Sequence, residues 1–216
     1  MTFQTERTRL RRKPARGSHD RAVIDSILDE AIVCHVAFPG AAVHGPGAGP
    51  VVLPTTHVRV GDQLYLHGSA ASHMLRTLAG CVEICVAVTL LDALVLARSA
   101  MHHSVNYRSV ILFGRARAVE DRTEKLAALA ALIDHAVPNR SAACRPPNDK
   151  ELAATLVIAL PIAEASAKAR SGPPLPDDAD AALPYWAGVI PLETVRRPAI
   201  PAPGCDLPPP PALMRS

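Results

Sequence analysis

The stretch PVVLPTTHVRVGDQLYLHG, residues 50–68, decides the fold class. Apolar and polar residues alternate along both of its arms, and Gly61-Asp62 lies between the arms. Alternation with a period of two is typical of half-buried strands, and a glycine-containing dipeptide between them is typical of a tight hairpin turn. The stretch therefore predicts a hairpin of two antiparallel strands.

Four further segments carry apolar residues at helical spacing, and Ser18, Asp20 and Asn148 stand where helix caps are expected. The expected helices are SHDRAVIDSILDEA (18–31), SAASHMLRTLAG (69–80), RTEKLAALAALIDHAV (122–137) and NDKELAATL (148–156).

The remaining apolar segments predict strands. They are IVCHVAF (32–38), two strands within 81–100 on either side of Asp92, HHSVNYRSVILFGRARAVED (102–121) and VIALPIAEASAKARSG (157–172). With the hairpin, this gives about six strands joined mostly by hairpins, which implies antiparallel pairing. We expect a mainly β fold with flanking helices (α+β), built on a small closed barrel.

The chain is expected to divide into three parts. Residues 1–17 are basic and predict a mobile arm, residues 18–195 form the folded domain, and residues 196–216 predict a disordered proline-rich tail. Within the domain, the apolar island YWAGVIPL (185–192) follows a Pro- and Asp-rich linker. We expect its Trp186 to dock on the barrel.

Composition narrows the class of protein. A hydrophobic content of 49% and a charged content of 20% in 216 residues indicate a globular chain. The net charge of +3 is too small and scattered to predict nucleic-acid binding. Five cysteines without a CxxC pair, no signal peptide and no apolar run near 18 residues predict a cytoplasmic protein that does not bind membranes.

The segment LYLHGSAASHML (64–75) carries the clearest chemical signal. It predicts a strand that turns into a helix, whose free N–H groups and serine hydroxyls suit an anion. The same serines also suit an ordinary helix cap, and their spacing does not separate the two interpretations. No metal site is expected, because the adjacent His102 and His103 point to opposite faces of a strand. No protein-borne nucleophile stands out either, which favours a bound cofactor.

Several segments together resemble the flavin-binding split-barrel proteins related to pyridoxamine 5'-phosphate oxidase, and more narrowly the nitroimidazole-resistance reductases. They are ILDEAIVCHVAF, the hairpin 50–68 with SAASHML, ICVAVTLLDALV, NYRSVILFGRARAVED, EASAKARSGPP and YWAGVIPL. The resemblance spans about residues 18–195 and implies a six-stranded antiparallel split barrel that binds FMN between the two chains of a homodimer.

The resemblance also implies site residues. The FMN phosphate is expected at His67, Gly68, Ser69, Ser72 and His73. Pro54, Thr55 and Thr56 are expected along the isoalloxazine edge. Asn106, Tyr107, Arg108 and Ser109 would face the flavin or the partner chain, with Lys168 and Arg170 nearby.

The chain departs from the family pattern in two places. Many relatives carry Arg or Lys where Ser72-His73-Met74 stands here, so Arg76, Arg108 or Lys168 would have to balance the phosphate charge. The Pro- and Gly-rich loop 39–50 is expected at the site entrance.

Three functions follow from the resemblance. The first is an FMN-dependent oxidoreductase that passes electrons to a small-molecule substrate. The second is a flavin-binding module without turnover. The third is a haem-binding or haem-degrading relative, which ranks lower because those relatives use a late histidine and this chain has none after His135.

Overall fold

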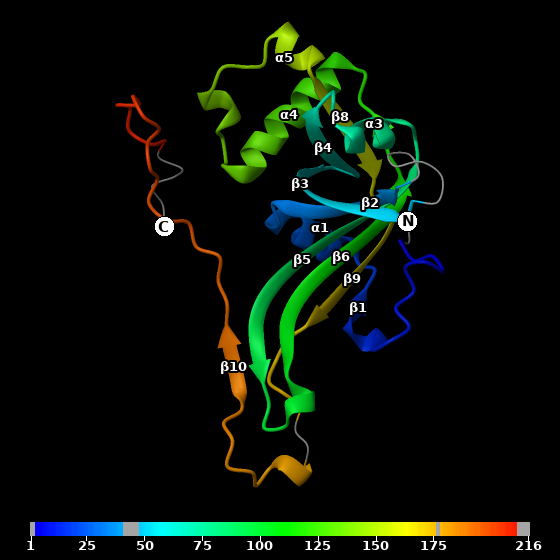
Figure 1. Cartoon of the computed structure of the whole chain (residues 1–216), viewed down its shortest axis with the longest axis vertical. Coiled ribbons are helices and arrows are strands. Elements are labelled where there is room, and N and C mark those ends of the chain that lie inside the picture. Colours follow the sequence, from blue (N-terminus) through cyan, green and yellow to red (C-terminus); the bar gives the residue numbers. More distant parts are fainter. Residues whose placement is uncertain (1–2, 41–47, 176–177, 211–216) are drawn as a thin grey trace.

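The computed structural model describes residues 3–40, 48–175 and 178–210 (Figure 1). The strands are β1 (Gly17–Ser18), β2 (Val33–Pro39), β3 (Pro50–Val60), β4 (Gln63–Ser69), β5 (Glu83–Leu96), β6 (Ser104–Arg115), β7 (Arg117–Ala118), β8 (Thr155–Pro161), β9 (Glu164–Arg170) and β10 (Gly188–Pro191). The α-helices are α1 (Arg21–Glu30), α3 (His73–Ala79), α4 (Arg122–Ala136) and α5 (Asp149–Ala153).

The strands form one antiparallel sheet in the order β1-β9-β6-β5-β2-β3-β4-β8-β7, and β10 pairs with β5. The mainly β fold with flanking helices is confirmed. The expectation of six strands in a closed barrel was wrong, because the described sheet has ten strands and its end strands β1 and β7 do not pair with each other. β1 and β7 contain only two residues each, too few to show a period of two in the sequence.

The predicted hairpin is confirmed. β3 pairs with β4 from Val60↔Gln63 to His57↔Leu66, and Gly61 adopts φ +57 at the turn. A positive φ is accessible to glycine at little cost, which is why this residue suits the turn. The register therefore follows directly from the position of the glycine.

The two strands predicted around Asp92 are a single strand, β5. Its pairing with β6 shifts between Leu91 and Ala93, so Asp92 is the extra residue of a β-bulge. A bulge bends a strand and redirects one side chain without ending the ladder. The polar residue that indicated a break in the sequence thus marks a bend.

The strands β2, β3, β5 and β6 have one buried face and one largely open face. The inner face packs on α1 and α3 and forms the main core, which includes Cys34, Val36, Val86, Val110 and Leu112. Directly paired residues share a face. The opposite, outer face therefore includes Val33 with Thr56, His35 with Pro54 and Ala87, Ala87 with Ile111, and Thr89 with Ser109. A smaller cluster beneath α4 covers only the β3–β4–β8 end of this sheet, at Val58, Tyr65 and Val157.

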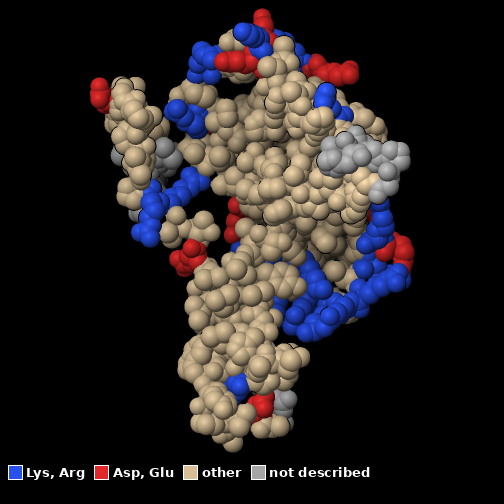
Figure 2. All heavy atoms as spheres, viewed as in Figure 1, with Lys and Arg blue, Asp and Glu red and all other residues tan. Residues whose placement is uncertain are grey.

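Beyond Asp92, the sheet narrows into a projecting ribbon, which we define as residues 92–106 together with β10. We call the rest of the sheet, with the helices that pack on it, the body. Figure 1 shows it extending away from the helix-covered body, and Figure 2 shows few charged side chains on it. Leu94, Val105 and Ile190 lie side by side across its strands and are 37%, 36% and 42% exposed. The island 185–192 docks through β10, but the prediction that Trp186 docks on the barrel was wrong, because this side chain is 65% exposed.

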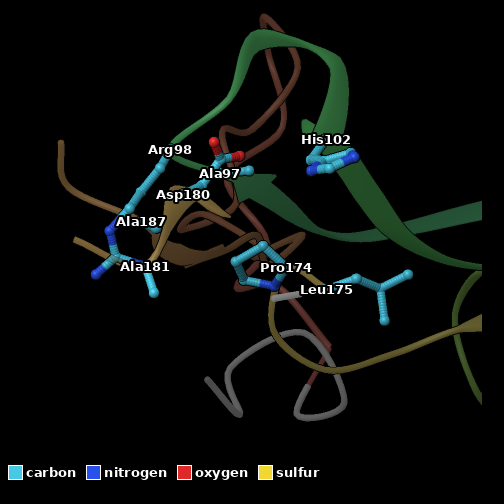
Figure 3. A pocket seen from close by; sticks show the side chains of 8 residues that line it. All are labelled: Ala97, Arg98, His102, Pro174, Leu175, Asp180, Ala181 and Ala187. Carbon is cyan, nitrogen blue, oxygen red and sulfur yellow. The ribbon is translucent and has the colours of Figure 1, made fainter. Parts of the chain in front are cut away.

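A small cavity lies at the tip of the ribbon (Figure 3). Arg98 and His102 line it from the β5–β6 connection, and Asp180 lines it from the segment before β10. Its volume of about 120 Å³ is below the roughly 300 Å³ at which ligand pockets begin. It is therefore too small for a nucleotide cofactor.

The segments at the two ends of the described chain differ in how they pack. Residues 3–18 fold back on the sheet, where Phe3 is buried and Gly17–Ser18 pair with β9. Residues 198–209 are exposed throughout. No helix in the described residues is long and apolar enough to cross a membrane.

Candidate functional site

The end of the β3–β4 hairpin places Thr56 next to His67. Their strands pair up to His57↔Leu66, so Thr56 and His67 are the next residues across the ladder. The Nδ1 atom of His67 is buried and has no hydrogen-bond partner among the described residues. Burial lowers the pKa of His67, so its ring is neutral at pH 7 and a nitrogen lone pair remains available.

The middle of β3 divides the predicted residues Pro54, Thr55 and Thr56 by alternation. Pro54 and Thr56 pair with His35 and Val33 on the outer face, whereas Thr55 pairs with the buried Cys34. Pro54 and Thr56 are exposed, so both are accessible to a ligand on the outer face.

The turn from β4 into α3 contains the predicted phosphate residues. Ser72 is the N-cap of α3 and accepts a hydrogen bond from Leu75 N at 3.4 Å, and Ser69 Oγ accepts one from Ala71 N at 3.1 Å. A Cβ atom on Gly68 would lie 2.9 Å from Leu75 Cδ1, so glycine allows α3 to pack closely here. Both serine hydroxyls thus stabilise the turn by accepting hydrogen bonds from backbone N–H groups. Each hydroxyl proton is still available to donate to a ligand.

A cationic hollow lies beside α3. Its cavity of about 430 Å³ is lined by His73, Arg76, Thr77, Gly80 and Val82. Arg76 Nη2 lies 3.2 Å from His73 Nδ1, and both side chains are exposed. Arg76 is therefore positioned next to the predicted phosphate residue His73, where its positive charge could balance the phosphate.

The predicted cluster on β6 is split by the same alternation. Tyr107 and Ser109 pair with Leu91 and Thr89 on the outer face. Asn106 lies on the other face and accepts a hydrogen bond from the buried Arg170. The Asn106 amide also donates to Gly172 O at 3.1 Å, and Arg170 donates to Pro173 O at 3.0 Å. These two residues tie the end of β9 to the ribbon.

Arg108 is bound by two carboxylates, Glu30 and Asp92, that were not predicted as site residues. Its Nη2 lies 2.7 Å from Asp92 Oδ1 and 2.8 Å from Glu30 Oε1. The hydrogen bonds that Arg108 donates to both carboxylates raise the pKa of Arg108, and the one that it donates to Glu30 lowers the pKa of Glu30. Since two negative charges already surround it, Arg108 is a poor source of charge for a phosphate.

The Arg108 cluster lies at the largest hollow among those described. The cavity of about 710 Å³ is bordered by the end of α1, by Thr89–Asp92 of β5 and by residues Leu192–Thr194 and Arg196. Leu192 N donates to Asp92 O at 2.9 Å, and Arg196 Nη2 donates to Ala136 O at 2.7 Å. Residues 192–196 therefore bridge the ribbon and the body. The lone Asp92 in an apolar strand was the sequence signal for this site, whereas nothing local marked Glu30.

Lys168 lies at the other edge of the sheet. It pairs with Ser109 on the outer face, and its carbonyl oxygen accepts a hydrogen bond from Ser109 Oγ at 3.1 Å. Its Nζ donates to Arg12 O at 3.2 Å. Lys168 thus joins the outer face to the N-terminal arm.

Within one chain, the two main groups of predicted residues remain apart. β4 and β6 are separated by β3, β2 and β5, which is four strand spacings or roughly 19 Å along the sheet. No three His, Cys, Asp or Glu side chains in the described part of the chain converge as a metal site.

Comparisons with known proteins agree with this arrangement. A family model described as pyridoxamine 5'-phosphate oxidase matches residues 20–169. The chain belongs to the pyridoxamine 5'-phosphate oxidase family. The resemblance stated from the sequence is therefore confirmed. A comparison with curated proteins found no significant match.

Two solved structures are similar to this chain over nearly their whole length. The flavocytochrome Anf3 from Azotobacter vinelandii is 39% identical, with a TM-score of 0.88, 97% of this chain covered and 95% of that chain. The FAD and heme binding protein from Mycobacterium smegmatis is also 39% identical, with a TM-score of 0.84 and coverages of 92% and 95%.

A third structure shares the fold. It is a protein assigned to 5-nitroimidazole antibiotic resistance from Bacteroides thetaiotaomicron, 22% identical with a TM-score of 0.58, covering 70% of this chain and 85% of its own. Of the loop 39–50 expected at the entrance of the family's site, residues 41–47 lie outside the described residues.

Proposed function

We propose that this member of the pyridoxamine 5'-phosphate oxidase family is a flavin-dependent redox protein that binds its flavin on the outer face of the sheet. The open outer face carries this proposal, because Pro54, Thr56, Tyr107 and Ser109 all lie on it. The resemblance favours FMN, and electrons would pass through the flavin to a small-molecule substrate. A flavin-binding module without turnover is the alternative.

A homodimer would complete this site. The groups on β4 and β6 are too far apart in one chain to surround one ring system, but a second copy would bring its own β6 against β4. The outer face also exposes Val33, Val52 and Ile111 by 47%, 56% and 41%, and contiguous exposed apolar surface favours association. The proposed flavin would then lie in the groove between two chains.

The residues on the outer face have distinct roles in this proposal. The bound flavin would supply the electron transfer. Thr56, Tyr107 and Ser109 would orient the ring through their hydroxyl groups, and the partner chain would exclude water. Ser69 and Ser72 would donate to the phosphate, with Arg76 balancing its charge.

The ratio of FMN to riboflavin affinity tests the phosphate contact. In the double variant Ser69→Ala, Ser72→Ala, two hydrogen bonds to a charged group are lost, at roughly 1.5–3 kcal/mol each. FMN affinity should fall by more than tenfold, while riboflavin affinity should not change. Ser26→Ala, on the exposed side of α1, is the control. An unchanged ratio would remove the phosphate from this turn.

Sedimentation tests the dimer. Ile111→Glu places a charge on the proposed interface and should produce a monomer that loses its flavin. Ile133→Glu changes a side chain of similar exposure, 38% against 41%, that lies on helix α4 and not on the strands of the proposed interface. It should remain a flavin-loaded dimer. A flavin-loaded monomer of the unchanged protein would refute this part of the proposal.

Binding of FAD with haem is the second candidate. It is favoured by the two relatives at 39% identity, one a flavocytochrome and one an FAD and heme binding protein. His67 is the residue that fits an iron ligand, since its neutral ring is partly buried at the outer face and its Nδ1 has no partner among the described residues. Reconstitution with haem should give a Soret band that His67→Ala removes, and a protein that takes up FMN but no haem would exclude this candidate.

A further inference from the structure

The N-terminal arm concentrates positive charge on one part of the molecule. Residues 3–18 contain six Lys or Arg and one Glu, a net charge of +5, whereas the whole chain carries +3. The rest of the chain is therefore slightly acidic, at −2. Figure 2 shows blue side chains gathered in a band at the base of the body.

The arm is a built loop. Phe3 packs in the main core, and Thr8 Oγ1 donates to Phe3 O at 3.1 Å. Leu10 closes the loop against Gly17, where a Cβ atom would lie only 1.9 Å from Leu10 Cδ1. These contacts fix both ends of the loop, so its cations are displayed at defined positions.

Three of these six cations lack acidic partners among the described residues, whereas Arg7 pairs with Glu83 and Glu164. Glu6 pairs with Arg11 at 2.7 Å and with Arg9 at 3.4 Å. No acidic side chain among the described residues pairs with Arg12, Lys13 or Arg16. We call Arg9–Arg16 the basic loop, and its unpaired charge is available to a partner.

The loop fits an acidic protein surface better than other anions. Its cations are spread over eight residues and four of them are exposed, whereas a small anion is bound by convergent donors. It contains no aromatic side chain on which nucleic-acid bases would stack. Phe3 packs in the core and Leu10 packs against Gly17, so neither large apolar side chain of the arm is presented to a lipid surface.

We propose that the basic loop is the docking surface for a small acidic electron-carrier protein. This inference rests on the proposed flavin function. Lys168 joins Arg12 of the loop to Ser109 on the outer face, so a docked carrier would lie beside the proposed flavin. Two carrier molecules would each lose one electron, and the flavin would gain both electrons together with protons from water.

A purified, strongly acidic plant-type ferredoxin is the probe. Its affinity is measured for the flavin-loaded protein, for Arg12→Glu, Lys13→Glu and for the control Arg122→Glu, Lys150→Glu. Both variants change the net charge by −4, but the control residues are exposed at the starts of α4 and α5. Only the loop variant should bind ferredoxin at least about tenfold more weakly than the unchanged protein. Complementary charge accelerates the encounter between specific surfaces, and this variant removes it from the basic loop.

Ionic strength and two other anions complete the test. The difference between the variants should shrink between about 10 mM and 100 mM salt, as the screening length falls from about 30 Å to about 10 Å. Equal ferredoxin affinity of the two variants would overturn the proposal. Tighter loop-dependent binding to duplex DNA or to phosphatidylserine vesicles would overturn it too.

Reduction by dithionite separates this inference from the proposed function. If all three proteins hold a flavin that dithionite reduces, ferredoxin should reduce the flavin more slowly in the loop variant alone. If none of them takes up flavin, the proposed function fails, and the ferredoxin affinities still decide whether the loop is a docking surface.

Discussion

The body and the ribbon use the same sheet in opposite ways. In the body, β5 and β6 bury Val86, Val88 and Leu112 to 1% exposure or less beneath helices. In the ribbon, the same two strands leave Leu94 and Val105 more than a third exposed, with no helix over them. One continuous pair of strands therefore builds a core at one end and an open apolar surface at the other.

The difference lies in what covers the strands. Helices α1, α3 and α4 bury the body, and only the four residues of β10 pair with the edge of the ribbon. Val95 on one face of the ribbon is fully buried, whereas the face with Leu94, Val105 and Ile190 is open. An open apolar strand face is an expected site of association with another chain. Stability should thus come from the body, and assembly from the outer face and ribbon.

Two substitutions of leucine by alanine should give the largest difference in the free energy of unfolding between the body and the ribbon. Leu112→Ala in the body removes a fully buried side chain and should lower the free energy of unfolding by about 2–5 kcal/mol. Leu94→Ala in the ribbon removes the same atoms from a surface that is 37% exposed, so urea unfolding at low protein concentration should show less than about 1 kcal/mol. Equal losses would show that the ribbon is as well packed as the body.

Acid should weaken the body through His57. This side chain is 1% exposed and its Nε2 donates to Leu28 O at 3.0 Å, and burial lowers its pKa to about 4. The unfolded chain, with a pKa near 6.5, binds the proton first, so stability falls as the pH drops from about 6.5 to about 4. The full loss is about 3 kcal/mol, since one pKa unit is about 1.4 kcal/mol.

His57→Gln isolates this effect, because its amide can still donate to the Leu28 carbonyl but does not titrate. Urea unfolding of both proteins over this pH range should show a flatter profile for the variant. Parallel profiles would mean that His57 is not the titrating group.

The sequence predicted the body well and the ribbon poorly, for physical reasons. Gly61-Asp62 and the capping box of Asn148 with Glu151 are local signals, and the structure confirms both the hairpin and α5. In the sequence, Asp92 indicated the end of one strand and the start of another. A polar residue within an apolar run marks either a turn or a β-bulge, and here it marks a bulge. Trp186 was expected to dock because it is the only tryptophan and lies in an apolar island, but its side chain is 65% exposed.

In the candidate site too, features set by local sequence could be predicted, whereas contacts between distant segments could not. The adjacency of Thr56 and His67 follows from the hairpin register and could be predicted from the sequence. The division of residues 106–109 between two faces also follows from alternation. By contrast, Glu30 reaches Arg108 across 78 residues of sequence, and only the packing of α1 against the sheet brings them together.

A smaller effect is expected where body and ribbon meet. Arg108→Met leaves Glu30 and Asp92 without their shared cation and should cost about 1 kcal/mol, since the three side chains are a third to a half exposed. The pKa of Glu30 is lowered in the folded state, so this stabilisation is present above its ordinary value near 4.3 and is lost as the pH falls through the folded pKa. Arg122→Met, whose pair with Asp149 is highly exposed, is the control and should change stability by only a few tenths of a kcal/mol. A gap between wild type and Arg108→Met that does not narrow in acid would contradict this account.

The smallest effect is expected from the segment that follows the ribbon. Ending the chain after Arg197 removes residues of which 198–209 are exposed, so the free energy of unfolding and the flavin content should change by less than about 0.5 kcal/mol and a few per cent. Ending it after Pro191 also removes the hydrogen bonds from Leu192 to Asp92 and from Arg196 to Ala136, and with them one wall of the 710 Å³ cavity. Since a hydrogen bond contributes about 0.5–1.5 kcal/mol net, this second truncation should cost roughly 1–3 kcal/mol. Thermal unfolding of the two truncated proteins measures the difference, and equal melting temperatures would show that residues 192–196 do not hold the ribbon to the body.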